Sequence, residues 1–193
     1  MQQRFDKTYY DRFYRNPTTR AVTPAGARRQ AAFVAAYLRH LQVPVRRILD
    51  VGCGVGTTLR ALGREFPRAT LLGVEVSDYL CERYGWTRGS VVDFHSARPF
   101  DLVVCHDVLA YLDERRCSRA IDNLGHLCRG ALYLGVLTAD DAELYDPRRT
   151  DPHQHRRPAA WYRRRLARQF VAVGGGLYLH RDADVVVWAL ERL

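Results

Sequence analysis

The sequence predicts an α/β fold in which a mostly parallel sheet is covered by helices on both faces. Between residues 46 and 137, short apolar segments alternate with segments of helical periodicity, a pattern typical of parallel strands joined by crossover helices. Three glycines follow the first apolar segment, at the place where such sheets hold their ligands. Two apolar segments near the C-terminus flank Gly174, Gly175 and Gly176, which predicts an antiparallel hairpin.

Seven strands and the helices between them follow from the residue pattern in chain order. Thr23 and Pro24 form a favourable helix start, because threonine caps a helix and proline needs no N–H partner in the first turn. Apolar side chains then recur at helical spacing from Phe33 to Leu41. The expected strands are residues 47–51, 70–76, 86–92, 100–105 and 131–137, followed by the two strands of the hairpin. Further helices are expected over residues 57–66, after Ser77 or Asp78, after Asp113 and from Pro158.

The chain of 193 residues fits one globular domain with a full hydrophobic core. We expect four parts in this single domain, residues 1–193. An N-terminal arm and helix (1–45) precede the core that carries the three glycines (46–137). A substrate-side insertion with a helix (138–169) and the C-terminal hairpin (170–193) follow.

The composition excludes several classes of protein. Apolar residues make up 47% of the chain and charged residues 26%, which is typical of a folded globular protein and not of a disordered one. No apolar run approaches the ~20 residues of a membrane-spanning helix, and the charged, aromatic N-terminus does not resemble a secretory signal. The five cysteines are scattered singly. We therefore expect reduced thiols, no zinc motif and a cytoplasmic location.

The net charge of +9 also fits a nucleic-acid partner, but the kind of basic residue does not favour one. Lys7 is the only lysine, and the arginines are spread along the chain. Such a bias is more typical of a GC-rich bacterial genome than of a phosphate-binding surface. Residues 155–168 do concentrate arginines, for which a solvated helix face is the simpler interpretation.

The glycines stand in the pattern D-x-G-x-G-x-G, from Asp50 to Gly56. A dinucleotide fingerprint, G-x-G-x-x-G, would need a third glycine at position 57, which is Thr57. This disfavours an NAD-dependent oxidoreductase, and the P-loop pattern is absent as well. Glycines allow a tight turn and a close approach of the backbone to a ligand. The sequence therefore predicts a site for a nucleotide-like cofactor of another kind.

The segment LDVGCGVG, residues 49–56, closely resembles the first motif of the class I S-adenosylmethionine-dependent methyltransferases. The resemblance implies a Rossmann-like, doubly wound sheet of seven strands, with S-adenosylmethionine as the cofactor and S-adenosylhomocysteine as the product. It places the methionine end of the cofactor at Asp50 and at the loop residues Gly52, Cys53, Gly54 and Gly56. The cofactor carries a sulfonium cation and no pyrophosphate, so an acidic loop suits it better than an anion-binding loop.

Three later segments extend the resemblance. Glu75, with Val76 beside it, lies about twenty residues beyond the loop, where an acidic side chain reaches a ribose diol; taken alone, it also fits a solvated strand end or a helix cap. Asp93 and Phe94 match the family position that recognises adenine, although Asp93 alone also fits a loop cap. Cys105 and His106 match the end of the fourth strand, which faces the donor methyl group. The short interval from Glu75 to Asp93 suggests a trimmed second helix and third strand.

Methyl transfer is a displacement at carbon, so the protein mainly aligns donor and acceptor. A base is needed only where the acceptor must lose a proton. His106 is the best candidate, since histidine titrates near neutrality, although a hydrogen bond to nearby backbone would explain it equally. Asp107 would orient His106 or face the substrate, and Tyr111 is a weaker candidate.

The polar stretch from residue 138 onward is expected to shape the acceptor pocket, as insertions here do in the family. Candidate substrate-binding residues are His153, His155, Trp161 and Tyr162, although helix packing is the simpler interpretation of Trp161. Asp151 and the two histidines would also suit a metal, but such a loop is usually only polar, and we expect no metal site. In the N-terminal arm, Tyr10 and Arg20, together with Tyr9, would fold over the cofactor as a lid or pack as a surface arm.

The predicted function is transfer of a methyl group to a small-molecule acceptor, without a membrane partner. One alternative is an RNA or protein methyltransferase, which the absence of an N-P-P-[YF] motif after residues 100–105 disfavours. A second alternative is a protein that binds the cofactor without transferring its methyl group. The sequence leaves the acceptor, the methylated atom and the oligomeric state open.

Overall fold

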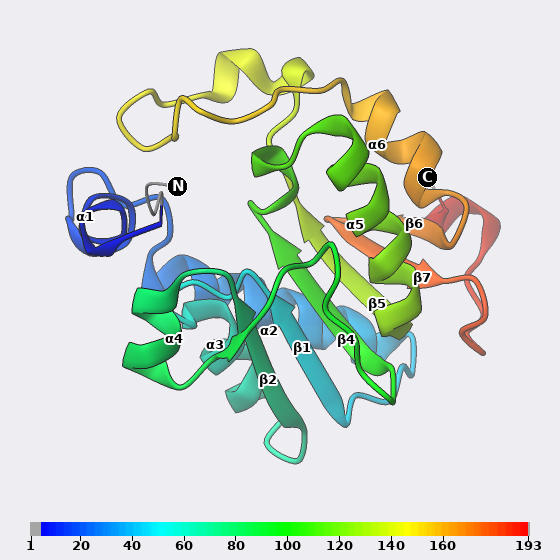
Figure 1. Cartoon of the computed structure of the whole chain (residues 1–193). Coiled ribbons are helices and arrows are strands. Elements are labelled where there is room, and N and C mark those ends of the chain that lie inside the picture. The colour runs from blue at the N-terminus through cyan, green and yellow to red at the C-terminus, as the bar shows by residue number, and fades with distance from the viewer. Residues whose placement is uncertain (1–4, 193) are drawn as a thin grey trace.

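The computed structural model describes residues 5–192 and shows one sheet between two layers of helices (Figure 1). The helices are α1 (Lys7–Tyr10), α2 (Pro24–His40), α3 (Thr57–Glu65), α4 (Asp78–Tyr84), α5 (Glu114–Leu127) and α6 (Ala159–Leu166). A π-helical turn, Asp11–Arg15, extends α1, and short 3₁₀ turns cover Leu109–Tyr111, Ala139–Leu144 and Ala189–Glu191. The strands are β1 (Arg47–Val51), β2 (Thr70–Glu75), β3 (Thr87–Arg88), β4 (Phe100–His106), β5 (Cys128–Gly135), β6 (Phe170–Gly174) and β7 (Leu177–His180).

The sheet has the strand order β3-β2-β1-β4-β5-β7-β6. Strands β3, β2, β1, β4 and β5 pair in parallel, whereas β7 is antiparallel to both β5 and β6. This arrangement confirms the doubly wound sheet and the antiparallel C-terminal hairpin. From β1 the chain proceeds outward to β2 and β3, and then crosses back to β4 on the other side. The carboxyl ends of β1 and β4 therefore form the switch point, where open α/β sheets bind ligands.

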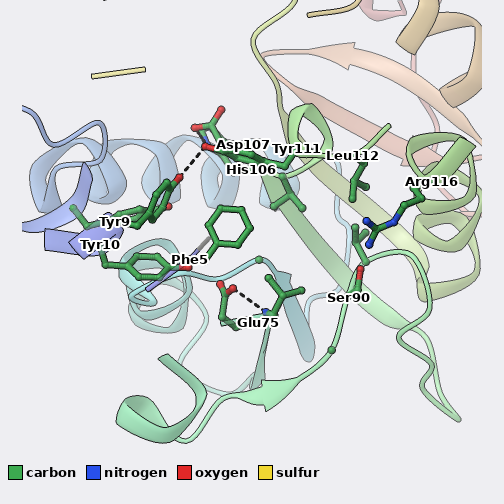
Figure 2. Close-up of a pocket in the computed structure, with 16 residues that line it drawn as sticks. Phe5, Tyr9, Tyr10, Glu75, Ser90, His106, Asp107, Tyr111, Leu112 and Arg116 are labelled. Atoms are coloured by element: carbon green, nitrogen blue, oxygen red, sulfur yellow. Dashed lines mark hydrogen bonds and ion pairs between the residues drawn. The ribbon is translucent and has the colours of Figure 1, made fainter. Parts of the chain in front are cut away.

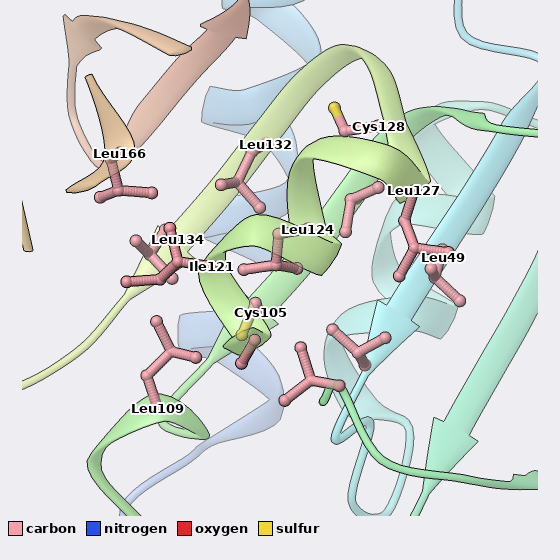
Figure 3. Packing of buried hydrophobic residues seen from close by; sticks show 14 of the residues in the cluster. Leu49, Cys105, Leu109, Ile121, Leu124, Leu127, Cys128, Leu132, Leu134 and Leu166 are labelled. Carbon is pink, nitrogen blue, oxygen red and sulfur yellow. The ribbon is translucent and has the colours of Figure 1, made fainter. Parts of the chain in front are cut away.

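The core follows the alternation of side chains along the central strands. Leu49 and Val103 belong to the apolar cluster that α5 and α6 cover, which Figure 3 shows. Ile48 and Leu102, one position earlier on each strand, belong to the opposite cluster with α2 and α3. Successive side chains of a strand point to opposite faces, so a strand that is apolar throughout requires helices on both faces. This is what the sequence predicted.

The expected helix starts carry the side chains that cap them. Thr23 Oγ1 accepts a hydrogen bond from Gly26 N at 3.0 Å, and Asp113 Oδ1 accepts one from Arg116 N at 2.8 Å. Ser77, and not Asp78, caps α4, because its hydroxyl accepts from Leu80 N. These bonds satisfy N–H groups that have no partner within the helix.

The third strand is shorter than its expected range of residues 86–92. Only Thr87–Arg88 pairs with β2, and the chain then turns, with Asp93 N and Phe94 N both donating to Ser90 O. The short interval between Glu75 and Asp93 leaves room only for the two-turn helix α4 and for the two-residue strand β3. Among the described residues, no helix is both long enough and apolar enough to span a bilayer.

Candidate active site

The carboxyl ends of β1, β2 and β4 meet the N-terminal arm, residues 5–22, around a cavity of about 210 Å³ (Figure 2). Its walls come from the glycine loop, the ends of β2 and β4, the turn after β3, the arm and the start of α5. In Figure 2, the Phe5 ring of the arm lies between Glu75 and the Tyr111 side of the cavity. The cavity is therefore bounded below by strand ends and covered by an aromatic arm.

Two loop glycines keep the backbone next to the cavity free of side chains. Gly52 and Gly54 have φ values of +76° and +53°, in the left-handed region that side chains other than glycine rarely adopt. A Cβ atom on Gly52 would clash with the Val108 side chain, and one on Gly54 would lie 3.3 Å from the Tyr14 ring. The missing side chains of Gly52 and Gly54 thus let Val108, and Tyr14 of the arm, pack directly on the loop backbone.

Glu75 ties the glycine loop to the end of β2. Its Oε2 accepts a hydrogen bond from Gly54 N at 2.8 Å, while Oε1 accepts from Val76 N at 2.8 Å and from Ser77 N at 3.1 Å. The residue is only 4% exposed, yet it lines the cavity. A carboxylate offers about four acceptor positions, so roughly one remains for a ligand hydroxyl, fewer than the two that a full ribose diol would need.

Asp50 lies at the end of β1 in a smaller hollow beside the cavity, with Cys53, Thr57 and His106. Burial raises the pKa of its carboxyl to about 7, an effect that nearby His106 opposes and Glu75 reinforces. A cationic ligand would lower the raised pKa of this buried carboxyl, because the ligand's positive charge stabilises the ionised carboxylate.

His106 and Asp107 form a pair at the end of β4. His106 Nδ1 lies 3.1 Å from Asp107 Oδ2, and the imidazole stacks on Tyr133 with 5.9 Å between ring centroids. Burial lowers the pKa of His106, but the hydrogen bond and charge of Asp107, with Asp50 further away, raise it by more, so the net direction is upward. The partner of His106 is thus a side chain, in contrast to the backbone partner considered as an alternative.

Asp107 has an unusual backbone conformation, which sets the direction of its carboxylate. Its φ is +56°, in the left-handed region, and its N–H donates to Gly135 O at 2.8 Å. Left-handed backbone at a residue other than glycine is uncommon and occurs often at functional sites. The turn brings the carboxylate to a wall that two cavities share.

The second cavity, of about 220 Å³, adjoins the first. Both are lined by Tyr9, Tyr14, Asp107 and Tyr111, so these four residues separate them. Tyr9 and Tyr111 are joined through their hydroxyls at 2.8 Å. The far wall of the second cavity comes from the insertion after β5, between residues 137 and 154. The site thus offers two adjacent spaces, one beside the glycine loop and one beside the insertion.

Comparisons with known proteins agree with this geometry. Residues 49–130 match the family model of a methyltransferase domain. The crystal structure of magnesium protoporphyrin IX methyltransferase from Synechocystis, with bound SAH, superposes with a TM-score of 0.62 at 21% identity, covering 87% of each chain. Residues 49–130 thus match a methyltransferase domain, and the sheet has the fold of a solved methyltransferase. The glycine loop and the order of elements along the chain are the features from which a class I S-adenosylmethionine-dependent methyltransferase was expected.

Three further proteins match parts of the chain at higher sequence identity. Trans-aconitate 2-methyltransferase of Pseudomonas paraeruginosa is 35% identical over 91 residues, which are 44% of this chain and 33% of that protein. The match to an uncharacterised Rickettsia prowazekii protein covers 38% of its length, so the chain spans little more than a third of these curated relatives. The structure of a sugar N-methyltransferase from Streptoalloteichus is 28% identical, with a TM-score of 0.54, covering 68% of this chain and 55% of that one.

The structure brings together most of the residues expected to hold the methyltransferase cofactor. Gly52, Glu75, Val76, His106 and Tyr10 line the first cavity. Asp50 and Cys53 line the adjoining hollow. Gly54 lies under Tyr14, and Gly56 begins α3 as its N-cap. Asp107 and Tyr111 stand on the wall between the two cavities.

Other expected cofactor residues lie elsewhere. Asp93 is exposed and Phe94 packs on the core, so neither lines the cavity; Ser90 and Val91 of the same turn do. Cys105 is fully buried in the apolar core, because strand alternation points it away from the cavity that His106 faces. Arg20 follows the arm's turn and lines neither cavity. An adenine role for Asp93 stays a prediction that this arrangement does not support.

The expected acceptor residues pack against α5 or lie outside the second cavity. Trp161 Nε1 donates to Glu114 Oε1 at 3.1 Å, and the buried Tyr162 hydroxyl accepts from Arg157. These contacts fit the packing interpretation of α6. His153 and His155 do not line either cavity, and the described residues contain no group of three His, Cys, Asp or Glu side chains that would hold a metal ion.

Reasoning from the sequence missed several residues that line the second cavity. Tyr14, Gln154 and Arg149 line it, together with Asp151, which the sequence suggested only as a metal ligand. Tyr14 had a local signal, since it lies among the aromatic residues of the arm. Gln154 and Arg149 had none, because the insertion lacks any periodicity that would orient its side chains.

Proposed function

We propose that this protein transfers a methyl group from S-adenosylmethionine to a small-molecule acceptor. The observation that carries the proposal is the pair of cavities separated by Tyr9, Tyr14, Asp107 and Tyr111. One cavity adjoins the glycine loop, and the other is closed by the insertion. In-line methyl transfer needs the donor and the acceptor on opposite sides of the methyl carbon. The two adjacent cavities would supply one space for each.

The residues around the first cavity fit the cofactor. The bare backbone at Gly52 and Gly54 would accept its close approach, and Asp50 would face the positively charged methionine end. Glu75 would accept a hydrogen bond from a ribose hydroxyl, as its remaining acceptor position allows. Val91 and Leu112, both buried and lining the cavity, would offer apolar surface to the adenine. When bound, the cofactor supplies a methyl group on a sulfonium sulfur, which is a good leaving group.

The protein's own contribution would be alignment and the exclusion of water. The arm covers the site with tyrosine rings, and the Tyr9–Tyr111 hydroxyl contact joins the arm to the turn after β4. Holding two reactants in line contributes up to about 7–11 kcal/mol toward lowering a barrier. The His106–Asp107 pair at this wall would take up a proton from an acceptor that must lose one.

A small acceptor is supported by the size of the second cavity, about 220 Å³, which suits a small molecule and not a folded polymer. The names of the trans-aconitate and sugar methyltransferase relatives also refer to small acceptors. Neither relative identifies the acceptor of this chain, because each match covers only part of the chain and of the relative.

Calorimetry with S-adenosylmethionine and S-adenosylhomocysteine tests the proposal at the cofactor site. We expect both compounds to bind, and Glu75→Gln to weaken binding about tenfold or more, since it removes the charge from hydrogen bonds that are worth about 1.5–3 kcal/mol each. Glu82→Gln, which removes the same charge from an exposed position on α4, should leave the affinity unchanged. Absence of both heat and thermal shift with either compound would contradict the proposal.

A further inference from the structure

Three arginines come together between α2 and α3, outside the two cavities of the candidate active site. They belong to a hollow of about 180 Å³, here called the arginine hollow, which is lined by Pro24, Arg28, Thr57, Arg60, Ala61 and Arg64. Both helices cover the same face of the sheet (Figure 1), where their buried residues belong to one apolar cluster. This packing brings Arg28 to the same hollow as two arginines from a distant part of the sequence.

The charged side chains that line the arginine hollow are all positive. No acidic residue lines it in the part of the chain that the structure describes. Arg60 and Arg64 lie four residues apart on α3, a spacing at which like charges repel and destabilise a helix. Glu65 follows Arg64 directly, but it pairs with Arg39 of α2, with 3.3 Å between Arg39 Nη2 and Glu65 Oε2. The acidic residue next to Arg64 is therefore paired elsewhere.

The three guanidinium groups keep their charge available to a ligand. Within residues 5–192, the Arg28 and Arg64 side chains make no hydrogen bond or ion pair. Arg60 Nη2 donates to Val55 O at 2.6 Å, and a carbonyl oxygen leaves the positive charge of Arg60 unmatched. A guanidinium group carries five N–H donors in a planar fork, which fits the oxygens of a phosphate.

The N-termini of the two helices add to the positive potential. Helix α2 begins at Pro24 and α3 at Thr57, and both of these residues line the arginine hollow. Neither helix has an acidic residue in its first turn, although the positive end of the helix dipole favours one there. Arg28 and Arg60 instead lie close to the two starts. Sequences that break a local preference in this way do so most often at functional sites.

We propose that the arginine hollow is a binding site for a phosphate group, held by Arg28, Arg60 and Arg64. A phosphate group carries about two negative charges near neutral pH, and its oxygens can accept from more than one guanidinium group at once. The hollow is far larger than one water molecule needs, so it has room for such a group. Arginines that converge on one hollow suit a single multiply charged group better than a nucleic-acid strand, whose successive phosphates need a groove along the backbone.

The proposed site is separate from the cofactor but connected to the glycine loop. None of the residues that line the arginine hollow lines either cavity. Thr57 also lines the space beside Asp50, and Arg60 bonds Val55 O within the glycine loop. A bound phosphate would therefore contact a side chain that supports the loop, without occupying the place of the cofactor or of the acceptor. The site does not depend on the proposed methyltransferase function.

Calorimetry with inorganic phosphate tests the site, in Tris buffer at constant ionic strength because salt screens exposed charges. We expect one phosphate to bind per chain with saturation, and the singly charged acetate ion to bind at least about tenfold more weakly. Glucose 6-phosphate and glucose identify the source of the group. Tighter binding of glucose 6-phosphate than of inorganic phosphate would assign the site to an organic phosphate, and equal or weaker binding would assign it to free phosphate. Absence of binding by both phosphate compounds overturns the proposal, also where an RNA oligonucleotide binds instead.

Variants locate the phosphate in the arginine hollow. Arg28→Gln and Arg64→Gln each remove one guanidinium group, so each should weaken phosphate binding at least about fivefold. The matched control is Arg68→Gln, which removes the same charge from an exposed position after α3 that does not line the hollow, and it should change the affinity by less than about twofold. Equal weakening in all three variants would show an effect of net charge alone and overturn the proposal, as would unchanged binding in both variants of the hollow.

Thermal unfolding separates a binding role of these arginines from a structural one. Because Arg64→Gln removes a like charge from the turn after Arg60, its melting temperature without phosphate should be equal to or higher than that of the unaltered protein. A structural role for Arg64 would lower it. Added phosphate should raise the melting temperature of the unaltered protein and of Arg68→Gln more than that of Arg28→Gln or Arg64→Gln. The same rise in all four proteins would contradict binding in the arginine hollow.

Discussion

Asp50 shows how one residue couples the cofactor site to pH. Its carboxyl is 3% exposed, and burial raises its pKa to about 7, against roughly 3.9 in an unfolded chain. The folded state therefore holds this proton where the unfolded chain has released it. It follows that the contribution of Asp50 to stability is present below about pH 4 and is lost as the pH rises toward 7.

Cofactor binding should release a proton from Asp50. The ammonium and sulfonium groups of S-adenosylmethionine favour the ionised carboxylate and so lower its pKa, which at pH 7 releases up to about half a proton per molecule bound. Calorimetry at pH 7 in phosphate and in Tris, buffers with different ionisation enthalpies, measures this number. Asp50→Asn should abolish the difference between the two buffers. Equal enthalpies for the unaltered protein would contradict the assignment of Asp50 to the cationic end of the cofactor.

At the residue scale, spacing predicted several of the side chains that line the first cavity and the hollow beside it, but not the contacts they make there. The positions of Asp50 and Glu75 follow from strand ends, which apolar runs mark clearly. Two of the backbone donors on Glu75 are local, Val76 N and Ser77 N. The third, Gly54 N, depends on how the glycine loop approaches the end of β2, and nothing local encodes that approach. Asp93 is exposed on the turn after β3 and lines neither cavity, so its adenine role stays a prediction.

The connection between β2 and β4 acts on the glycine loop through Trp86. Trp86 Nε1 donates to Gly54 O at 2.9 Å, and its ring packs where Gly56 and Gly73 lack side chains. Gly56, the third glycine of the motif, thus leaves the space that the Trp86 ring occupies. A short connection that leaves β3 with two residues still places a large ring behind the loop.

Trp86→Phe should loosen the loop without disrupting the sheet. The variant loses one hydrogen bond to a loop carbonyl, which costs about 0.5–1.5 kcal/mol of unfolding free energy, and we expect roughly fivefold weaker binding of S-adenosylhomocysteine. Denaturant unfolding and calorimetry measure the two effects. Trp188→Phe, at an exposed position near the C-terminus, is the matched control and should change neither. Cofactor affinity that stays the same in Trp86→Phe would show that the loop holds its shape without this brace.

At the element scale, the strands and long helices were predictable because apolar periodicity and caps mark them. The insertion after β5 was not, since its 3₁₀ turn and loop are held by tertiary contacts, such as His155 N donating to Ala110 O at 2.7 Å. The second cavity depends on those contacts. Many of the residues that line the second cavity therefore come from the segment about which the sequence says least.

At the scale of the whole molecule, the arm lies beside the carboxyl ends of the strands (Figure 1) and lines the first cavity with them. Its direct bonds to the core include Ser77 Oγ donating to Phe5 O at 2.6 Å and the Tyr9–Tyr111 hydroxyl pair. Phe5, Tyr9, Tyr10 and Tyr14 all line the first cavity. Since the arm covers the site, a cofactor must displace it to enter, and the bound cofactor should in turn stabilise the closed position.

Limited trypsin digestion measures this coupling at the scale of the whole chain. The arm carries Lys7, Arg12 and Arg15 as cleavage sites, and cutting requires the arm to leave the surface. A ligand bound only under the closed arm lowers the open population by about 1 + [L]/Kd, so S-adenosylhomocysteine at 100 times its Kd should slow these cuts by up to about a hundredfold when opening is fast relative to cleavage. Mass spectrometry follows each site, with the exposed Arg148 and Arg181 as internal controls that should change far less. Equal protection at all sites would indicate global stabilisation, and no protection at the arm would mean that the cofactor binds without closing it.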